Sequence, residues 1–261
     1  MTHASVRLRA FLGLFSRDLW VLVRHEPVAF LAQALLQPLF YLFIFGRVLP
    51  EIGAAQGAYG TQLLPGILAL TLFLTALQAT ALPLVIEFSF TKEIEDRLLA
   101  PLSVNGVAIQ KLLIAALRGI VAAALIVPLG ALILPGGIDL GGASWPGFVA
   151  LMLLGSIAGA SVGLTLGTLV PPNRINVMFA VALTPLLFTG ATFYPWSGLD
   201  SIRWFQVVTL LNPLTYVSEG MRAALTDTPS LGAGWIALGL AVSLSAFAAA
   251  GLIGFRRRAV D

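Results

Sequence analysis

The chain has 261 residues, of which 58% are hydrophobic and 10% are charged, and it contains no cysteine. Soluble domains carry roughly 25% charged residues, so this composition excludes an ordinary soluble protein and predicts an integral membrane protein. The lack of cysteine excludes disulfides and thiolate metal sites. The net charge of +3 does not indicate nucleic-acid binding, because the basic residues lie at the ends of apolar runs and orient the chain in a bilayer.

Residues 1–26 predict an amphipathic helix that lies on the cytoplasmic surface of the membrane. Its apolar residues fall within an arc of about 100° on a helical wheel; they are Leu8, Phe11, Leu12, Phe15, Leu19 and Leu22. The opposite side carries Arg9, Ser16, Arg17 and Arg24, whereas Arg7 and Asp18 fit the pattern poorly. A cytoplasmic extension of the first span is the alternative. We therefore divide the chain into this segment, 1–26, and a transmembrane domain, 27–261.

Six charge-free runs of at least 20 residues predict six transmembrane helices in an all-α fold. The runs are 27–46, 52–86, 119–138, 140–173, 175–199 and 228–255. Crossing the hydrocarbon core takes roughly 20 residues of helix, and lipid offers the backbone no hydrogen-bond partner, so each run must be helical. We place the spans near 28–48, 62–86, 112–134, 147–170, 176–194 and 235–255.

The basic residues predict the orientation of the spans. All but three of the 15 Lys and Arg residues flank the spans on one side, and the exceptions are Arg47, Arg203 and Arg222. By the positive-inside rule both termini are expected in the cytoplasm.

The cytoplasmic loop that follows the second span, 87–105, is rich in acidic residues. Ile94, Leu98 and Leu99 stand at helical spacing among its charges, and Pro101 ends the turn. A short helix with one apolar stripe and one charged face is suited to docking on a cytoplasmic partner. A solvated loop that only joins two spans is the alternative, and periodicity does not choose between them.

Two features of the third and fourth spans bear on packing and charge. Arg118, about two turns into the third span, is expected to snorkel to the cytoplasmic interface or to pair with a loop carboxylate, and a ligand role is the alternative.

The fourth span places Ser156 and Ser161 among glycines at four-residue spacing, namely Gly155, Gly159, Gly163 and Gly167. This small-xxx-small pattern indicates close helix packing.

Several function classes lack the residues that they need. The chain has no Gly-rich P-loop for ATP phosphates. Its two histidines, His3 and His25, precede the first span, so no histidine metal site or proton-transfer site is expected in the membrane. Ion-coupled carriers use ionisable groups within their spans, and the middles of these runs have none. We therefore expect neither an enzyme nor a metal site. A passive channel without a recognisable filter and a structural scaffold stay open as alternatives.

The segment 193–225, before the last span, is predicted to be interfacial or re-entrant and not a full span. Its longest charge-free run, 204–218, contains Asn212-Pro213 and is too short to span. Glu219 and Arg222 stand three residues apart, so they could pair on a helix. The pair fits either an ordinary surface contact or a gate.

Two motifs carry a resemblance to a known family. Asp96-Arg97-Leu98, followed by Pro101 and Ser103, resembles the intracellular loop of bacterial ABC-type-2 permeases, which export drugs, lipids and polysaccharides. Leu211-Asn212-Pro213-Leu214-Thr215-Tyr216, with Phe193-Tyr194-Pro195 upstream, resembles the segment before their last span. The order of elements matches over nearly the whole chain. One departure is Lys92-Glu93, where many members have a smaller residue.

The resemblance implies a half-transporter in a bacterial inner membrane. Two permease chains, identical or homologous, would form the pathway, and separate cytoplasmic ATPase subunits would bind ATP and Mg²⁺, so no cofactor is expected in this chain. The implied ATPase-coupling residues are Glu93, Glu95, Asp96, Arg97, Leu98 and Pro101. The implied residues of the outer re-entrant segment are Tyr194, Pro195, Asn212, Pro213, Tyr216, Glu219 and Arg222.

The apolar spans favour a hydrophobic or amphipathic substrate, such as a drug or a lipid, that enters from the bilayer. Similar exporters imply a path between the first and fifth spans, where the aromatic candidates are Phe40, Tyr41, Phe179 and Phe188. Aromatic residues that face lipid give the same pattern. A lipid-linked polysaccharide is the alternative substrate.

Overall fold

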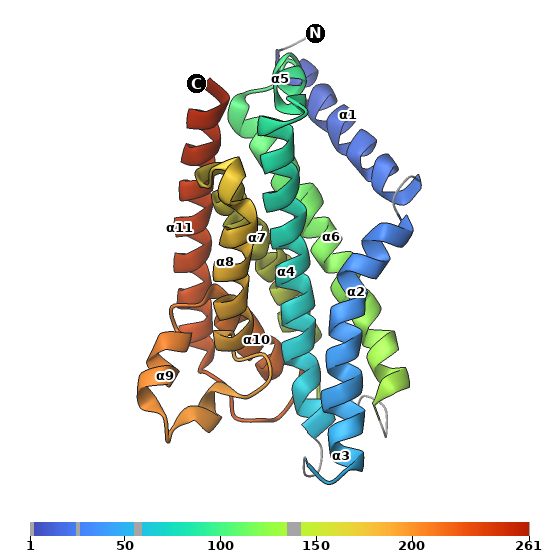
Figure 1. The fold of residues 1–261 in the computed structure, drawn as a ribbon, viewed down its shortest axis with the longest axis vertical. Helices are drawn as coiled ribbons and strands as arrows, with labels where there is room; N and C mark the ends of the chain where they lie inside the picture. The colour runs from blue at the N-terminus through green and yellow to red at the C-terminus, as the bar shows by residue number, and fades with distance from the viewer. Residues whose placement is uncertain (1–2, 25–26, 55–58, 135–141, 261) are drawn as a thin grey trace.

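The computed structural model describes residues 3–24, 27–54, 59–134 and 142–260. Within these ranges the chain is helical and has no strand, which confirms the all-α prediction (Figure 1). The elements are α1 His3–Arg24, α2 Pro27–Phe43, the π-helix η1 Ile44–Val48, α3 Leu49–Glu51, α4 Tyr59–Ser89, α5 Glu93–Leu98, α6 Val104–Ile133, α7 Trp145–Leu169, the 3₁₀-helix η2 Pro172–Arg174, α8 Ile175–Thr189, the 3₁₀-helix η3 Trp196–Leu199, α9 Arg203–Thr209, α10 Pro213–Leu225 and α11 Ala233–Val260. The predicted boundary at residue 26, and His25, lie outside the described residues.

Five stretches in the described part of the chain are long and apolar enough to cross a membrane: Pro27–Glu51, Gln62–Ser89, Val104–Ile133, Trp145–Leu169 and Ala233–Val260. The chain is therefore a multi-pass membrane protein, and the prediction of six full spans is confirmed for these five.

The predicted span 176–194 corresponds to α8, which ends early. At 15 residues its length is about 22 Å, short of the roughly 30 Å hydrocarbon core. The chain leaves the helix at Gly190, and Ala191 adopts a φ of 50°. The carbonyl oxygens of these two residues accept hydrogen bonds from Ser218 and Arg222 of α10. Tertiary bonds thus replace the last helical turns that the hydropathy pattern predicts.

The two ends of the helical bundle have different structures (Figure 1). The first turns of α1, the short helix α5 and the last turns of α11 lie together at one end, here called the α5 end. The helices α3 and α9 lie at the opposite, α9 end. The described part of the chain therefore begins, in α1, and ends, in α11, on the same side of the bundle.

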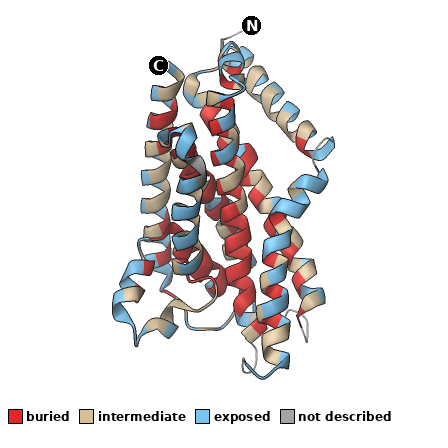
Figure 2. Cartoon of the chain, viewed as in Figure 1, coloured by how far each residue is buried: buried red, intermediate tan, exposed pale blue. Residues whose placement is uncertain are grey.

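The helix α4 forms the centre of the bundle, and its buried residues continue into α10 (Figure 2). The glycine ladder of α7 packs against it. A Cβ atom built at Gly159 would lie 2.4 Å from the carbonyl oxygen of Phe73, and one at Gly163 would lie 2.3 Å from that of Leu77. The predicted small-xxx-small packing is confirmed, because only glycine lets the two backbones approach this closely.

We expect Gly163→Ala to lower the thermal stability of the detergent-solubilised chain by an amount equivalent to about 1–3 kcal/mol, the usual cost of overpacking. The matched control is Gly234→Ala in α11, where a Cβ would meet nothing within 4 Å. Both variants gain the higher helix propensity of alanine, worth up to about 1 kcal/mol, so the difference isolates the clash. Equal melting temperatures for the two variants would contradict this packing.

Candidate functional site

The short helix α5 is held in place by tertiary contacts. Six residues are too few for a helix that is stable alone. Ile94 is 1% exposed and belongs to an apolar cluster with Leu84 of α4 and with Val107 and Ala108 of α6. Lys92, directly before the helix, adopts a left-handed φ of 56° and turns the chain into it. The alternative of a solvated connecting loop is therefore wrong.

A buried polar contact joins α5 to α1 and α6. The guanidinium of Arg97 donates two hydrogen bonds to the carboxylate of Asp18, at 3.0 and 2.9 Å, and Gln110 donates a third at 2.9 Å. The side chains of Arg97 and Asp18 are only 6% and 13% exposed. A bidentate pair of this kind fixes orientation as well as distance. Next to it, Lys111 of α6 pairs with Glu87 at the end of α4.

The surroundings of this pair keep both of its members charged. Burial alone raises the pKa of the Asp18 carboxyl, but hydrogen bonds from Arg97 and Gln110 and the charges of Arg97 and Lys111 outweigh burial, so this pKa lies below its ordinary value. Burial alone lowers the pKa of Arg97, and the hydrogen bond and charge of Asp18, with the charges of Glu87 and Glu93, raise it overall. The contact is therefore an ion pair across the physiological pH range.

The structure separates the predicted coupling residues into two groups. Glu95, Asp96 and Pro101 are exposed at the α5 end, and Glu93 is half-buried. Arg97 and Leu98 face the protein, where Leu98 packs against the apolar cluster around Ile94. Of the expected apolar stripe, Ile94 and Leu98 thus support α5 from within, whereas Leu99 is 86% exposed. The residues of α5 left for a partner, Glu95 and Asp96, are acidic.

Sequence reasoning missed Asp18 and Gln110 as partners of Arg97. One signal was present, because Asp18 is an acidic residue that breaks the amphipathic pattern of α1. A carboxylate out of place on a helix face indicates a basic partner from another element.

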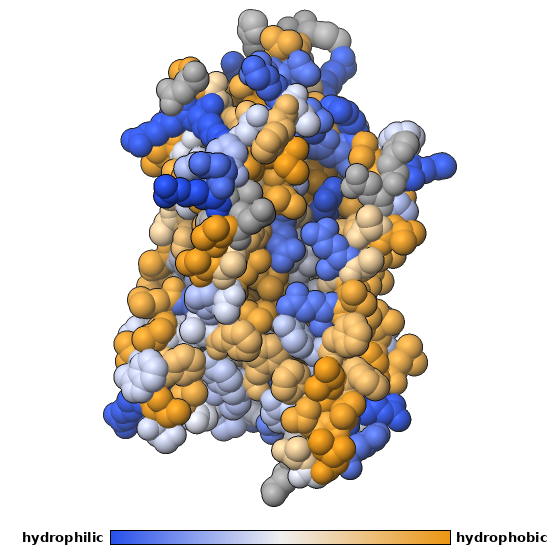
Figure 3. Space-filling view, viewed as in Figure 1, coloured by the Kyte–Doolittle hydropathy of each residue, from blue (hydrophilic) through white to orange (hydrophobic). Residues whose placement is uncertain are grey.

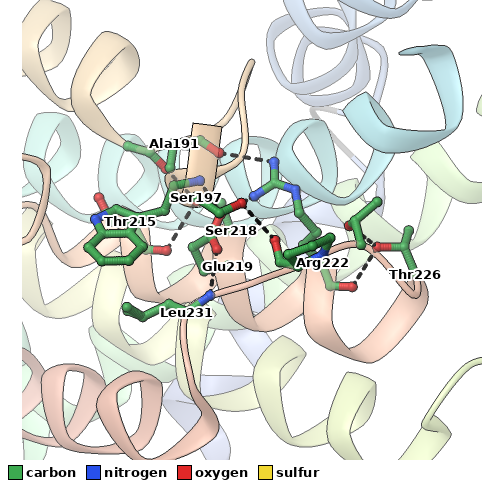
Figure 4. Close-up of polar contacts among 12 residues, drawn as sticks. Ala191, Ser197, Thr215, Ser218, Glu219, Arg222, Thr226 and Leu231 are labelled. Carbon is green, nitrogen blue, oxygen red and sulfur yellow. Dashed lines mark hydrogen bonds and ion pairs between the residues drawn. The ribbon is translucent and has the colours of Figure 1, made fainter. Parts of the chain in front are cut away.

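A second polar cluster lies at the α9 end, around Glu219 of α10 (Figure 4). The carboxylate of Glu219 accepts hydrogen bonds from the backbone N–H groups of Trp196, at 3.0 Å, and Leu231, at 2.8 Å, and it pairs with Arg222. Arg222 also donates to the carbonyl oxygen of Ala191 at 3.1 Å. Both side chains are buried, at 0% and 1% exposed, so the alternative of an ordinary surface pair is wrong.

The other predicted residues of the outer segment anchor the same region. Asn212 caps α10 by accepting from Leu214 N at 2.9 Å and donates to the carbonyl oxygen of Leu186 in α8 at 2.9 Å. Tyr216 donates to Leu210 O at 2.7 Å. Pro213 is the first residue of α10, where its missing N–H costs nothing. Tyr194 and Pro195 lie directly before η3. Tyr194 donates a hydrogen bond to Phe188 O at 2.5 Å, and Pro195 is the N-cap of η3.

The aromatic candidates for a substrate path are only partly brought together. Phe193, which follows α8, lies 5.1 Å from Tyr41 and 6.3 Å from Phe188, measured between ring centroids. It therefore links the first span to α8, a role that sequence reasoning did not assign. Phe40 is exposed, and Phe179 packs against the main core. Among the described residues no group of three His, Asp or Glu side chains could hold a metal ion.

Comparison with known proteins agrees with this architecture. The family model for ABC-2 type transporters matches residues 9–226. The chain is also similar to ycf38 of Cyanophora paradoxa, which carries the name of a transport permease, with 28% identity over 79% of this chain and 71% of that protein. The chain belongs to the ABC-2 type transporter family, as a transport permease that forms the membrane subunit of an ABC transporter.

Proposed function

We propose that this permease exports hydrophobic or amphipathic substrates, such as a drug or a lipid, and that ATP hydrolysis in separate cytoplasmic subunits drives the export. Those subunits would bind ATP and Mg²⁺, and a second permease chain would complete the pathway. The protein would lie in a bacterial inner membrane with both termini in the cytoplasm.

The proposal rests on the exposed acidic residues of α5. Glu95 and Asp96 are exposed on a helix that cannot shift independently, because Arg97 and Ile94 tie it to three other helices. A partner that presses on this surface would transmit its movement to α1, α4 and α6 together. Such a rigid connection is what an ATPase needs in order to move the spans.

The test is a pull-down of the tagged chain from native membranes in mild detergent, followed by an ATPase assay. We expect the wild type to retain a soluble ATPase and the double variant Glu95→Lys/Asp96→Lys to lose it. The matched control, Glu51→Lys/Asp227→Lys, reverses two exposed carboxylates outside the α5 end and should retain the ATPase. Recovery of the wild-type chain alone, under conditions that preserve other membrane complexes, would overturn the proposal.

A further inference from the structure

An apolar groove of about 370 Å³ lies between α7, α8 and α11, and the turn from α9 to α10 also lines it. Its walls include Leu166 of α7, Ala182 and Pro185 of α8 and Phe247 of α11. Phe247 is near the middle of the apolar stretch Ala233–Val260, about 20 Å along the helix from either end. The groove therefore lies at the depth of the hydrocarbon core.

The polar side chains at the groove have partners within the protein. Thr189 donates to the carbonyl oxygen of Pro185 at 2.9 Å. The amide of Asn212 donates to the hydroxyl of Thr189 and to the carbonyl oxygen of Leu186, each at 2.9 Å, and its oxygen accepts from Leu214 N. A hydrocarbon chain therefore suits this groove better than a polar group, which would lose its hydrogen bonds to water there.

Two exposed arginines lie near the groove at the α5 end. Arg174 is the last residue of η2, directly before α8, and Arg257 is in the last turn of α11. Within the described residues neither side chain donates a hydrogen bond or forms an ion pair, and the connection 170–174 contains no acidic residue. Figure 3 shows hydrophilic side chains beside the end of α11 and the start of α8, with hydrophobic side chains beyond them toward the α9 end.

The neighbouring Arg258 fixes the last turn of α11. It donates to a backbone carbonyl oxygen of α7 at 3.0 Å and to Ser89 of α4 at 2.7 Å. Arg257 follows Gly239 by about five full helical turns, so the two residues share one face of α11. That face meets α10, since a Cβ atom at Gly239 would lie 2.2 Å from the ring of Tyr216. Arg257 is therefore held on the side of α11 that carries the groove.

We propose that the groove holds an acyl chain of an anionic phospholipid from the leaflet at the α5 end, and that Arg174 and Arg257 bind its phosphate. Guanidinium groups bind phosphate oxygens through paired hydrogen bonds, and basic pockets between membrane helices bind anionic head groups. The depth fits as well. Pro185 lies about 15 Å from the start of α8, and one leaflet provides about half of the roughly 30 Å hydrocarbon core.

This lipid would occupy a different side of α8 from the expected substrate path. Leu186 lines the groove, and Phe188 stands about 200° around the helix from it. Phe188 instead lies 6.3 Å from Phe193, measured between ring centroids, which links α8 to the first span. The bound lipid is therefore a structural partner of α8 and of the turn at Asn212, whatever molecule the permease exports.

The test uses the purified chain in nanodiscs of phosphatidylcholine that contain a small fraction of phosphatidylglycerol with a diazirine in one acyl chain. The comparison probe is phosphatidylcholine with the same labelled chain. We expect phosphatidylglycerol to label peptides of α8 and α11, and unlabelled phosphatidylglycerol to compete. The double variant Arg174→Gln/Arg257→Gln should weaken this labelling about tenfold or more, since it removes both phosphate contacts. The matched control, Arg7→Gln/Arg17→Gln, removes two exposed arginines of α1 and should leave labelling unchanged.

A second pair of variants tests the groove itself. Ala182→Phe fills the groove with a ring and should abolish labelling, whereas Ala180→Phe adds the same ring at an exposed position outside it and should retain labelling. Equal labelling by the two probes, or unchanged labelling of the arginine double variant or of Ala182→Phe, would overturn the proposal. A disulfide between two copies of the single-cysteine variant Ala182→Cys would overturn it as well, because a second chain would then cover the groove.

Discussion

The variant Glu219→Gln is expected to lose about 3–5 kcal/mol of folding free energy, the usual cost when one partner of a buried ion pair is removed. The substitution keeps the size of the side chain but leaves the guanidinium of Arg222 buried, at 1% exposure, without its carboxylate. It also weakens the acceptor for the N–H groups of Trp196 and Leu231. Because these bonds join η3 and the segment just before α11 to α10, the outer segment should loosen first. Limited proteolysis and thermal denaturation in detergent measure both effects.

The matched control is Glu51→Gln, which breaks the exposed pair between Arg47 and Glu51. Exposed pairs contribute about 0–1 kcal/mol, so its melting temperature should stay near that of the wild type. The double variant Glu219→Gln/Arg222→Met should recover part of the loss, because the unpaired charge is gone. Equal stability of Glu219→Gln and Glu51→Gln would show that the buried pair does not hold the outer segment.

The variant Asp18→Asn is expected to abolish coupling while all spans remain inserted. Losing the carboxylate leaves the nearly buried Arg97 without its hydrogen-bonded counter-charge, which costs roughly 3 kcal/mol or more. A change of 1.4 kcal/mol is a factor of ten in an equilibrium, so the equilibrium constant for docking of α5 should fall about a hundredfold. The measurement is substrate-dependent ATPase activity of the complex, together with the hydrogen-exchange protection of α1.

The variant Arg17→Gln is the control, because Arg17 is the neighbouring residue on α1 and is exposed. It should change neither readout. The charge swap Asp18→Arg/Arg97→Asp should restore part of the protection of α1. If Asp18→Asn left α1 protected and coupling intact, the connection between α1 and α5 would have no role in transport.

The same ion pair predicts how docking of α1 depends on pH. The pKa of Asp18 is lower in the folded chain than its ordinary value, so its contribution to stability is fully present above the unfolded pKa of about 3.9. The contribution is lost as the pH falls through the folded pKa. The hydrogen-exchange protection factors of α1 should therefore be constant from about pH 5 to 8. A midpoint of protection near pH 6 would contradict this assignment.

The sequence predicts helices well where they depend on neighbouring residues and on the surrounding lipid. Lipid forces each apolar run to be helical, and five of the six expected spans are present. Ile94 and Pro101 correctly predict the position of α5. The glycine spacing of α7 predicts its packing because each missing Cβ is visible in the sequence.

The sequence does not predict contacts between distant segments. Arg97 and Asp18 are 79 residues apart, and no periodicity connects them. The early end of α8 likewise depends on bonds from Ser218 and Arg222 to Gly190 and Ala191, which hydropathy does not record.

The most direct test of an ATP-driven permease that couples through α5 is site-specific photocrosslinking in native membranes. Leu99 and Leu211 are exposed leucines of similar accessibility, 86% and 83%; Leu99 directly follows α5, and Leu211 lies between α9 and α10. A photoreactive residue at position 99 should capture a cytoplasmic ATPase, and the same residue at position 211 should not. Capture of an ATPase from position 211, or from neither position, would contradict the account.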